Sequence, residues 1–198
     1  IVDADTRKAY ALTGGYVDWL RANINTNLPV VEANVVKDDM MSYARLADLS
    51  AAFRARPNED KRRKEDTDGH KEFPARLARQ YMRLASNVAV ALNKEILDNE
   101  VLRVVRKVAL NTSHGHTLNI AGWLCSHNPK HDRTHQECGG IQTGTFASWC
   151  NMPEERMVNY LGFLRKIGVL AYRRTSAGEM WLLTDRMHEL YQQVVGSE

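Results

Sequence analysis

The feature that most constrains the fold is an apolar stripe in the stretch PARLARQYMRLASNVAVALN, residues 74–93. Its large apolar residues recur at spacings of four, three, four and four: Leu77, Tyr81, Leu84, Val88 and Leu92. This spacing places them on one side of an α-helix. Pro74 fits the first turn of that helix, because the N–H that it lacks would have no partner there. The stretch therefore predicts an amphipathic helix that packs on other helices.

Helical patterns also lie on both sides of this stretch. The N-terminal part predicts two helices, with an interruption at Gly14–Gly15 and a turn near Asn25–Pro29. After the stripe, ILDNEVLRVVRKVALNTSHG predicts a further helix, with Asp98 or Asn99 as its N-cap and Gly115 beyond its end. We therefore expect residues 1–115 to form a helical bundle.

The charge of the chain is unevenly distributed. Residues 54–107 hold 14 Lys and Arg against 9 Asp and Glu, whereas residues 108–198 hold 8 of each. The basic run Lys61–Lys64 could contact phosphate or remain solvated in a polar loop. The basic excess therefore lies in the middle of the chain.

The sequence also indicates a cellular setting. Three cysteines do not make a disulfide framework, and no apolar run approaches the length that crosses a bilayer. The first residues lack the pattern of a signal peptide and do not begin with Met. We expect a cytoplasmic protein without a membrane partner, of which this chain is one piece.

The last third of the chain predicts three short helices and a β-hairpin. The helices are TLNIAGWLCSH, TGTFASWC and PEERMVNYLGFLRKIG, and the strands are VLAYRRT and EMWLL around the turn SAG. In the third helix, Met157, Leu161 and Leu164 share one face with Gly168, which should end the helix in the left-handed region. That face is expected to pack on Ile120, Leu124, Phe146 and Trp149.

This order resembles winged helix-turn-helix domains, and RMVNYLGFLRKIGVL is similar to their usual second helix, closing glycine and first wing strand. The resemblance implies a winged helix-turn-helix domain over residues 116–198. The expected fold class is thus mainly α, a helical bundle followed by a winged helix with a small hairpin wing. Asn can pair with adenine, Arg with guanine, and basic wing residues can reach phosphate. The expected DNA-binding residues are Arg156, Asn159, Tyr160, Lys166, Arg173 and Arg174.

Two acidic residues oppose DNA contact. Glu154 and Glu155 stand at the end of the helix that should point at base edges, where they favour the helix dipole but repel phosphate. Winged helices also serve as protein-interaction modules. A stand-alone winged-helix transcription regulator and an interaction module without DNA binding therefore remain as alternatives.

A cluster of His and Cys follows the first of these three helices. In CSHNPKHDRTHQEC, a tetrahedral zinc site could use Cys125, His131, His135 and Cys138, because thiolate and imidazole are the usual ligands of zinc. The cluster contains no C-x2-C pair. A polar surface insertion without metal is the other interpretation.

The stretch from Pro74 to Leu110 carries a second resemblance. It is similar to the helical lid that follows the ATPase core in AAA+ proteins, closest to the minichromosome-maintenance (MCM) helicases. In that family an Arg opens the lid helix and an Arg-Leu-Ala-type run follows seven residues later, as Arg76 and Arg83–Ala85 do here. The resemblance implies that Arg76 senses nucleotide phosphate. Arg79 departs from the pattern, since the family often has an acidic residue there. A plain helical bundle with a solvated arginine face is the alternative.

The motifs argue against an active site complete in this chain. No G-x-x-x-x-G-K-[ST] phosphate loop is present, and neither G-x-S-x-G nor H-E-x-x-H occurs. We therefore expect no enzyme activity from the chain itself and ATP only in a larger parent protein. The predicted function is the non-catalytic C-terminal part of a DNA-acting ATPase or replicative helicase. Its winged helix would contact DNA or a partner, such as an upstream ATPase core or a neighbouring subunit.

Overall fold

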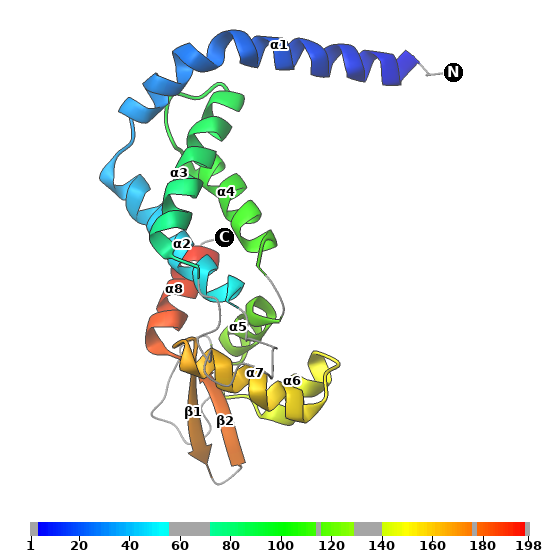
Figure 1. Ribbon diagram of the computed structural model, residues 1–198, viewed down its shortest axis with the longest axis vertical. Helices are drawn as coiled ribbons and strands as arrows, with labels where there is room; N and C mark the ends of the chain where they lie inside the picture. Colours follow the sequence, from blue (N-terminus) through cyan, green and yellow to red (C-terminus); the bar gives the residue numbers. More distant parts are fainter. Residues whose placement is uncertain (1–3, 56–71, 114–115, 129–139, 176–177, 197–198) are drawn as a thin grey trace, which may run out of the picture.

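The fold is mainly helical. The computed structural model describes residues 4–55, 72–113, 116–128, 140–175 and 178–196. Over these ranges the chain forms eight helices and one two-stranded antiparallel sheet, which confirms a mainly α chain with a small hairpin. Figure 1 shows an elongated arrangement with α1 at one end and the hairpin at the other. None of these helices is both long and apolar enough to cross a membrane.

Four helices form the bundle, and α3 lies among the other three. They are α1 (Ala4–Ala33), α2 (Lys37–Arg54), α3 (Pro74–Ala91) and α4 (Asn99–Asn111). Leu77 and Tyr81 of the predicted stripe are buried, whereas Leu92, at the end of α3, is exposed. Pro74 occupies the first helical position as predicted. The stripe therefore directs α3 into the bundle.

The predicted N-cap of α4 is confirmed. The carboxylate of Asp98 accepts hydrogen bonds from the backbone N–H groups of Glu100 and Val101, both at 3.1 Å. These bonds satisfy two donors that the first turn of a helix otherwise leaves unpaired. Gly115, the expected glycine beyond the end of α4, lies outside the described residues, as does the basic run Lys61–Lys64.

The N-terminal helix contradicts the expectation. α1 is continuous through Gly14–Gly15 and through the segment Asn25–Pro29, where we expected a turn. A proline inside a helix costs about 3 kcal/mol, so the helix needs support from packing. Leu28 packs against the core and Val31 is fully buried, and α1 lies against α3. Tertiary burial therefore overrides the local turn signal.

Three helices and the two strands follow the bundle, and we call them together the hairpin unit. It consists of α5 (Thr117–His127), α6 (Thr143–Trp149), α7 (Glu154–Lys166), β1 (Leu170–Thr175) and β2 (Gly178–Leu183). The two strands pair from Leu170 with Leu183 to Thr175 with Gly178. Ile141 adds a bridge to Trp181, with N–O distances of 3.0 Å in both directions. This order agrees with the three helices and the β-hairpin expected in the last third of the chain.

The prediction that Trp149 belongs to the core of this unit is wrong. Ile120, Leu124 and Phe146 are buried beneath α7 as predicted, but Trp149 is 42% exposed. It stands at the end of a seven-residue helix, where the chain turns toward α7, so its ring reaches the surface.

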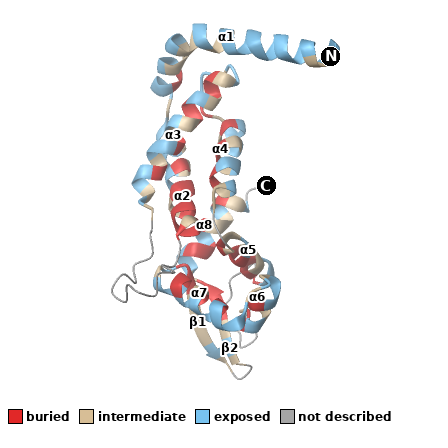
Figure 2. Ribbon diagram, turned by 45° about the vertical axis from the view of Figure 1, so that its right-hand side comes forward, coloured by how far each residue is buried: buried red, intermediate tan, exposed pale blue. Residues whose placement is uncertain are grey.

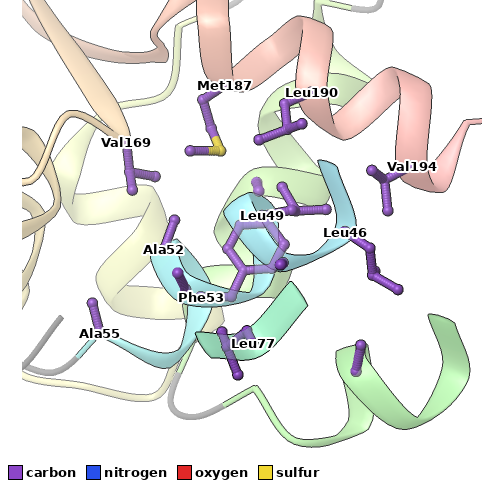
Figure 3. Packing of buried hydrophobic residues seen from close by; sticks show 14 of the residues in the cluster. Leu46, Leu49, Ala52, Phe53, Ala55, Leu77, Val169, Met187, Leu190 and Val194 are labelled. Carbon is purple, nitrogen blue, oxygen red and sulfur yellow. The ribbon is translucent and has the colours of Figure 1, made fainter. Parts of the chain in front are cut away.

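A C-terminal helix, α8 (Asp185–Val195), was not foreseen from the sequence. The hydroxyl of Thr184 caps it by accepting a hydrogen bond from the N–H of Met187 at 3.3 Å. α8 packs on α2 of the bundle and on α5 of the hairpin unit. Figure 3 shows Met187, Leu190 and Val194 of α8 facing the α2 side chains. This helix therefore links the bundle to the hairpin unit.

The buried apolar residues form one cluster that runs from the bundle into the hairpin unit. Figure 2 shows buried segments in both parts. The division into two domains, residues 1–115 and 116–198, stays a prediction. α8 belongs to the second range by sequence, but it packs on α2 of the first.

The cluster makes a stability prediction with a matched control. Phe53 is fully buried and its ring lies 6.3 Å from that of Tyr191, whereas Phe73 is 78% exposed. Phe53→Ala should lower the free energy of unfolding by about 3–5 kcal/mol, and Phe73→Ala should change it by less than about 0.5 kcal/mol. Urea unfolding followed by circular dichroism measures both. Equal effects of the two substitutions would contradict the burial described here.

Candidate nucleic-acid interface

The turn between α6 and α7 sets the direction of α7. Asn151 has a φ of 49°, which lies in the left-handed region that Asn tolerates. The N–H of Met152 then donates to the carbonyl of Ala147 at 2.9 Å and closes the turn. This geometry places α7 across the hairpin unit, between α6 and β1, on which it packs.

One side of α7 fills the core as predicted. Met157, Leu161 and Leu164 are fully buried. Gly168 follows the helix with a φ of 78°, the conformation that a glycine adopts without strain. The buried side therefore fixes which residues of α7 can meet a partner.

The opposite side of α7 is open to solvent. Six of its exposed residues follow helical spacing along the whole element: Glu155, Val158, Asn159, Gly162, Arg165 and Lys166. We call this set the open face. A Cβ added at Gly162 would meet nothing within 4 Å, so the middle of the face is a shallow gap between larger side chains. The face ends in two cations at the C-terminus of the helix, where they favour the helix dipole.

The structure separates Tyr160 from the other expected DNA-binding residues. Arg156, Asn159 and Lys166 are exposed. The Tyr160 hydroxyl lies 2.6 Å from the Thr117 hydroxyl and accepts hydrogen bonds at the start of α5, and burial raises its pKa. Tyr160 thus fastens α7 to α5, and we leave it out of the interface.

The two arginines of the β-hairpin, Arg173 and Arg174, do not act as a pair. Arg173 lies opposite Met180 and Arg174 lies opposite Glu179, and neighbouring strand residues point to opposite faces. Arg174 is exposed and Arg173 is partly buried. Since Glu179 stands across from Arg174, its carboxylate offsets part of the positive charge on that face.

An aromatic contact connects α7 to the β-hairpin formed by β1 and β2. The guanidinium carbon of Arg165 lies 5.4 Å from the ring centroid of Tyr172, within reach of a cation–π interaction. The ring of Tyr172 in turn meets the ring of Trp181 edge to face, with 5.3 Å between the ring centroids. A hydrogen bond to the Glu179 carboxylate raises the pKa of Tyr172. Arg165 was not among the residues expected from the sequence, although its position on the open face follows from the same helical spacing.

An aromatic cluster is the second feature that sequence reasoning missed. Trp123 and His127 of α5 lie against Trp149, with ring centroids 4.8 Å and 5.5 Å away. His127 is exposed and Trp149 partly so. The i, i+4 spacing of Trp123 and His127 could have indicated a shared helix face, but their contact with Trp149 depends on the α5–α6 packing.

The expected zinc site cannot be assembled from the described residues. Cys125 is buried, and burial raises the pKa of its thiol to about 11. His131, His135 and Cys138 lie outside the described residues. Within the described ranges, no group of three or more His, Cys, Asp or Glu side chains could hold a metal ion. The zinc site stays a prediction.

Arg76, the expected nucleotide-sensing residue, lies on α3 in the bundle and is exposed. Arg79, Gln80 and Arg83 lie beside it around the same open hollow. The expected nucleotide-sensing residue and the expected DNA-binding residues therefore lie on separate elements, α3 in one case and α7 with the β-hairpin in the other.

Comparison of the chain with protein-family models, with curated proteins and with solved structures gives no match.

Two glycines flank the C-terminal half of α7 and give opposite predictions. Gly162→Ala should raise the free energy of unfolding by about 0.5–1 kcal/mol, because alanine favours the helix and nothing obstructs its Cβ. Gly168→Ala should lower it by about 1–2 kcal/mol, because φ is 78° there. Chemical denaturation of both variants measures the difference. A loss of stability in Gly162→Ala would show that this face is covered.

Proposed function

We propose that this chain binds DNA through the open face of α7 and the adjacent wing. The observation that carries the proposal is the open face itself. Its middle is left free by Gly162, with Asn159 on one side and two cations toward the C-terminus. A single helix with an open face fits the major groove, and a gap at its middle lets the helix axis approach the base edges.

The side chains of the open face match the chemistry of the groove. Asn159 can donate to and accept from adenine, and Val158, which is 49% exposed, can contact a thymine methyl group. Arg165 and Lys166 can hold phosphates at the other end of the helix. The open face thus offers both base-reading and backbone-positioning groups.

The acidic end of α7 sets the orientation of this contact. Glu154 and Glu155 repel phosphate, but a carboxylate can accept a hydrogen bond from the cytosine amino group. The N-terminal end of α7 therefore enters the groove at a base edge, and the C-terminal end stays near the phosphate backbone. Residues near the start of a recognition helix are the ones that usually reach bases.

A second, larger assignment is the C-terminal part of a DNA-acting ATPase, in which Arg76 contacts nucleotide phosphate. The observation that favours it is that Arg76 is exposed near the start of α3 and borders an open hollow. Fluorescent ATP titrated against the parent ATPase should then bind more weakly when Arg76 is replaced by Ala. Unchanged nucleotide affinity would contradict this assignment and leave the DNA contact untouched.

The DNA contact is tested by fluorescence anisotropy with labelled duplexes at several salt concentrations. Replacing Arg165 and Lys166 together by Ala should reduce the slope of log affinity against log salt by about 2, because each lost phosphate contact removes about 0.9. Asn159→Ala should cost about 1–3 kcal/mol on the preferred sequence and less on others. The first change weakens binding to every sequence, and the second weakens discrimination.

The control variant removes a cation elsewhere. Arg103 is exposed on α4, and Arg103→Ala should leave both the affinity and the salt slope close to those of the wild type. If the wild-type chain binds no duplex even at low salt, the open face meets a protein instead and the proposal is wrong.

A further inference from the structure

Four long polar side chains of α3 form a stripe on its exposed side. Arg76, Arg79, Gln80 and Arg83 are all exposed and line one open hollow of about 340 Å³. We call them the α3 stripe. Their spacings of three, one and three residues keep them within one side of the helix, opposite the buried Leu77, Tyr81 and Ala85. Figure 2 shows exposed segments along α3.

The charge of the stripe is not balanced within its own helix. α3 contains three Arg and neither Asp nor Glu. The acidic residue just before it, Glu72, pairs with Arg54 at 2.9 Å. Among the described residues, no carboxylate forms an ion pair with Arg76, Arg79 or Arg83. The stripe therefore presents three positive charges to solvent on the described surface.

The position of these arginines does not serve the helix. Cations near a helix N-terminus oppose the helix dipole, and like charges three or four residues apart repel each other by a few tenths of a kcal/mol. Arg76 lies in the first turn, and Arg79 and Arg83 follow at those spacings. The arrangement slightly destabilises α3, and an anionic partner bound to the stripe would offset this cost.

The geometry selects the kind of anion. Arg76 and Arg83 stand seven residues apart, which is about 10 Å along the helix axis. A strand of nucleic acid carries one phosphate per nucleotide, so a line of guanidinium groups of this length can contact successive phosphates of the strand. A single nucleotide needs donors that converge on one small group, whereas these arginines are spread along a line.

We infer that the α3 stripe binds the phosphate backbone of a nucleic-acid strand, as a contact surface separate from α7. Guanidinium groups suit this partner because their planar fork can hold two phosphate oxygens at once. The amide of Gln80 adds a donor within the same stripe. The inference shares with the proposed function only the class of partner, and it does not depend on which residues of α7 reach the bases.

The test is a triple variant, Arg76→Ala with Arg79→Ala and Arg83→Ala, in the 198-residue chain. Because the three side chains are exposed and repel one another, the variant should unfold at the same temperature or a higher one. Its affinity for labelled single-stranded DNA should fall at least about tenfold at low salt, with a salt slope smaller by about 2. The triple Arg→Lys variant should keep the slope and lose only part of the affinity.

The matched control removes charge from another helix. Arg103 and Lys107 are exposed on α4, and their double Ala variant should bind single-stranded DNA within about twofold of the wild type. The Arg165 and Lys166 double variant separates the two surfaces. If it binds both duplex and single-stranded DNA normally while the triple variant loses single-stranded DNA, the proposed role of α7 fails and the inference stands.

Three outcomes would overturn the inference. One is unchanged DNA binding by the triple variant while the α7 variant loses it, which leaves only the proposed function. Another is a loss of fluorescent ATP binding without a loss of DNA binding, which assigns the stripe to a nucleotide. The third is an absence of DNA binding by the wild-type chain together with stripe-dependent binding to an acidic polypeptide such as polyglutamate.

Discussion

The structure depends on the burial of residues 49–53 of α2 on all sides. Leu49, Ser50, Ala51, Ala52 and Phe53 are consecutive and all buried, so this turn of the helix has no face toward water. A helix that is apolar all round lies inside a protein. The two alanines keep the helix thin enough for α3 on one side and α8 on another, while Phe53 fills the space toward Tyr191. α2 is therefore the axis around which both parts of the molecule are assembled.

The position of the candidate interface follows from this burial. α8 packs on α2 and on α5, and Val169, just after α7, belongs to the same cluster around Leu49 and Met187 (Figure 3). The Tyr160 hydroxyl then fastens α7 to the start of α5. With its buried side held by the core and its flank held by Tyr160, α7 presents the open face to a partner. The open face is thus positioned by packing and not by a flexible loop.

Local patterns predicted the elements whose signal is strong and whose environment is simple. The apolar side of α3, the Asp98 cap, the buried side of α7 and the hairpin all follow from spacing or from the chemistry of single residues. The continuous α1 could not be predicted, because Pro29 is a local stop signal that only the burial of Val31 overrides. α8 carried a readable signal, a Thr cap followed by apolar residues at helical spacing. Of the site, spacing predicted Asn159 and Lys166, but the internal partner of Tyr160 depends on how α5 meets α7.

The basic residues of α3 and those at the end of α7 differ in how much they indicate about a partner. Arg165 and Lys166 stand in the last turn of α7, where cations stabilise a helix, so helix stability alone can account for them. Arg76 stands in the first turn of α3, and Arg79 and Arg83 follow where each repels the next, so helix stability argues against them. No described carboxylate balances these three charges, and an anionic partner would do so. The α3 stripe is therefore stronger evidence for an anionic partner than the cations of the predicted recognition helix.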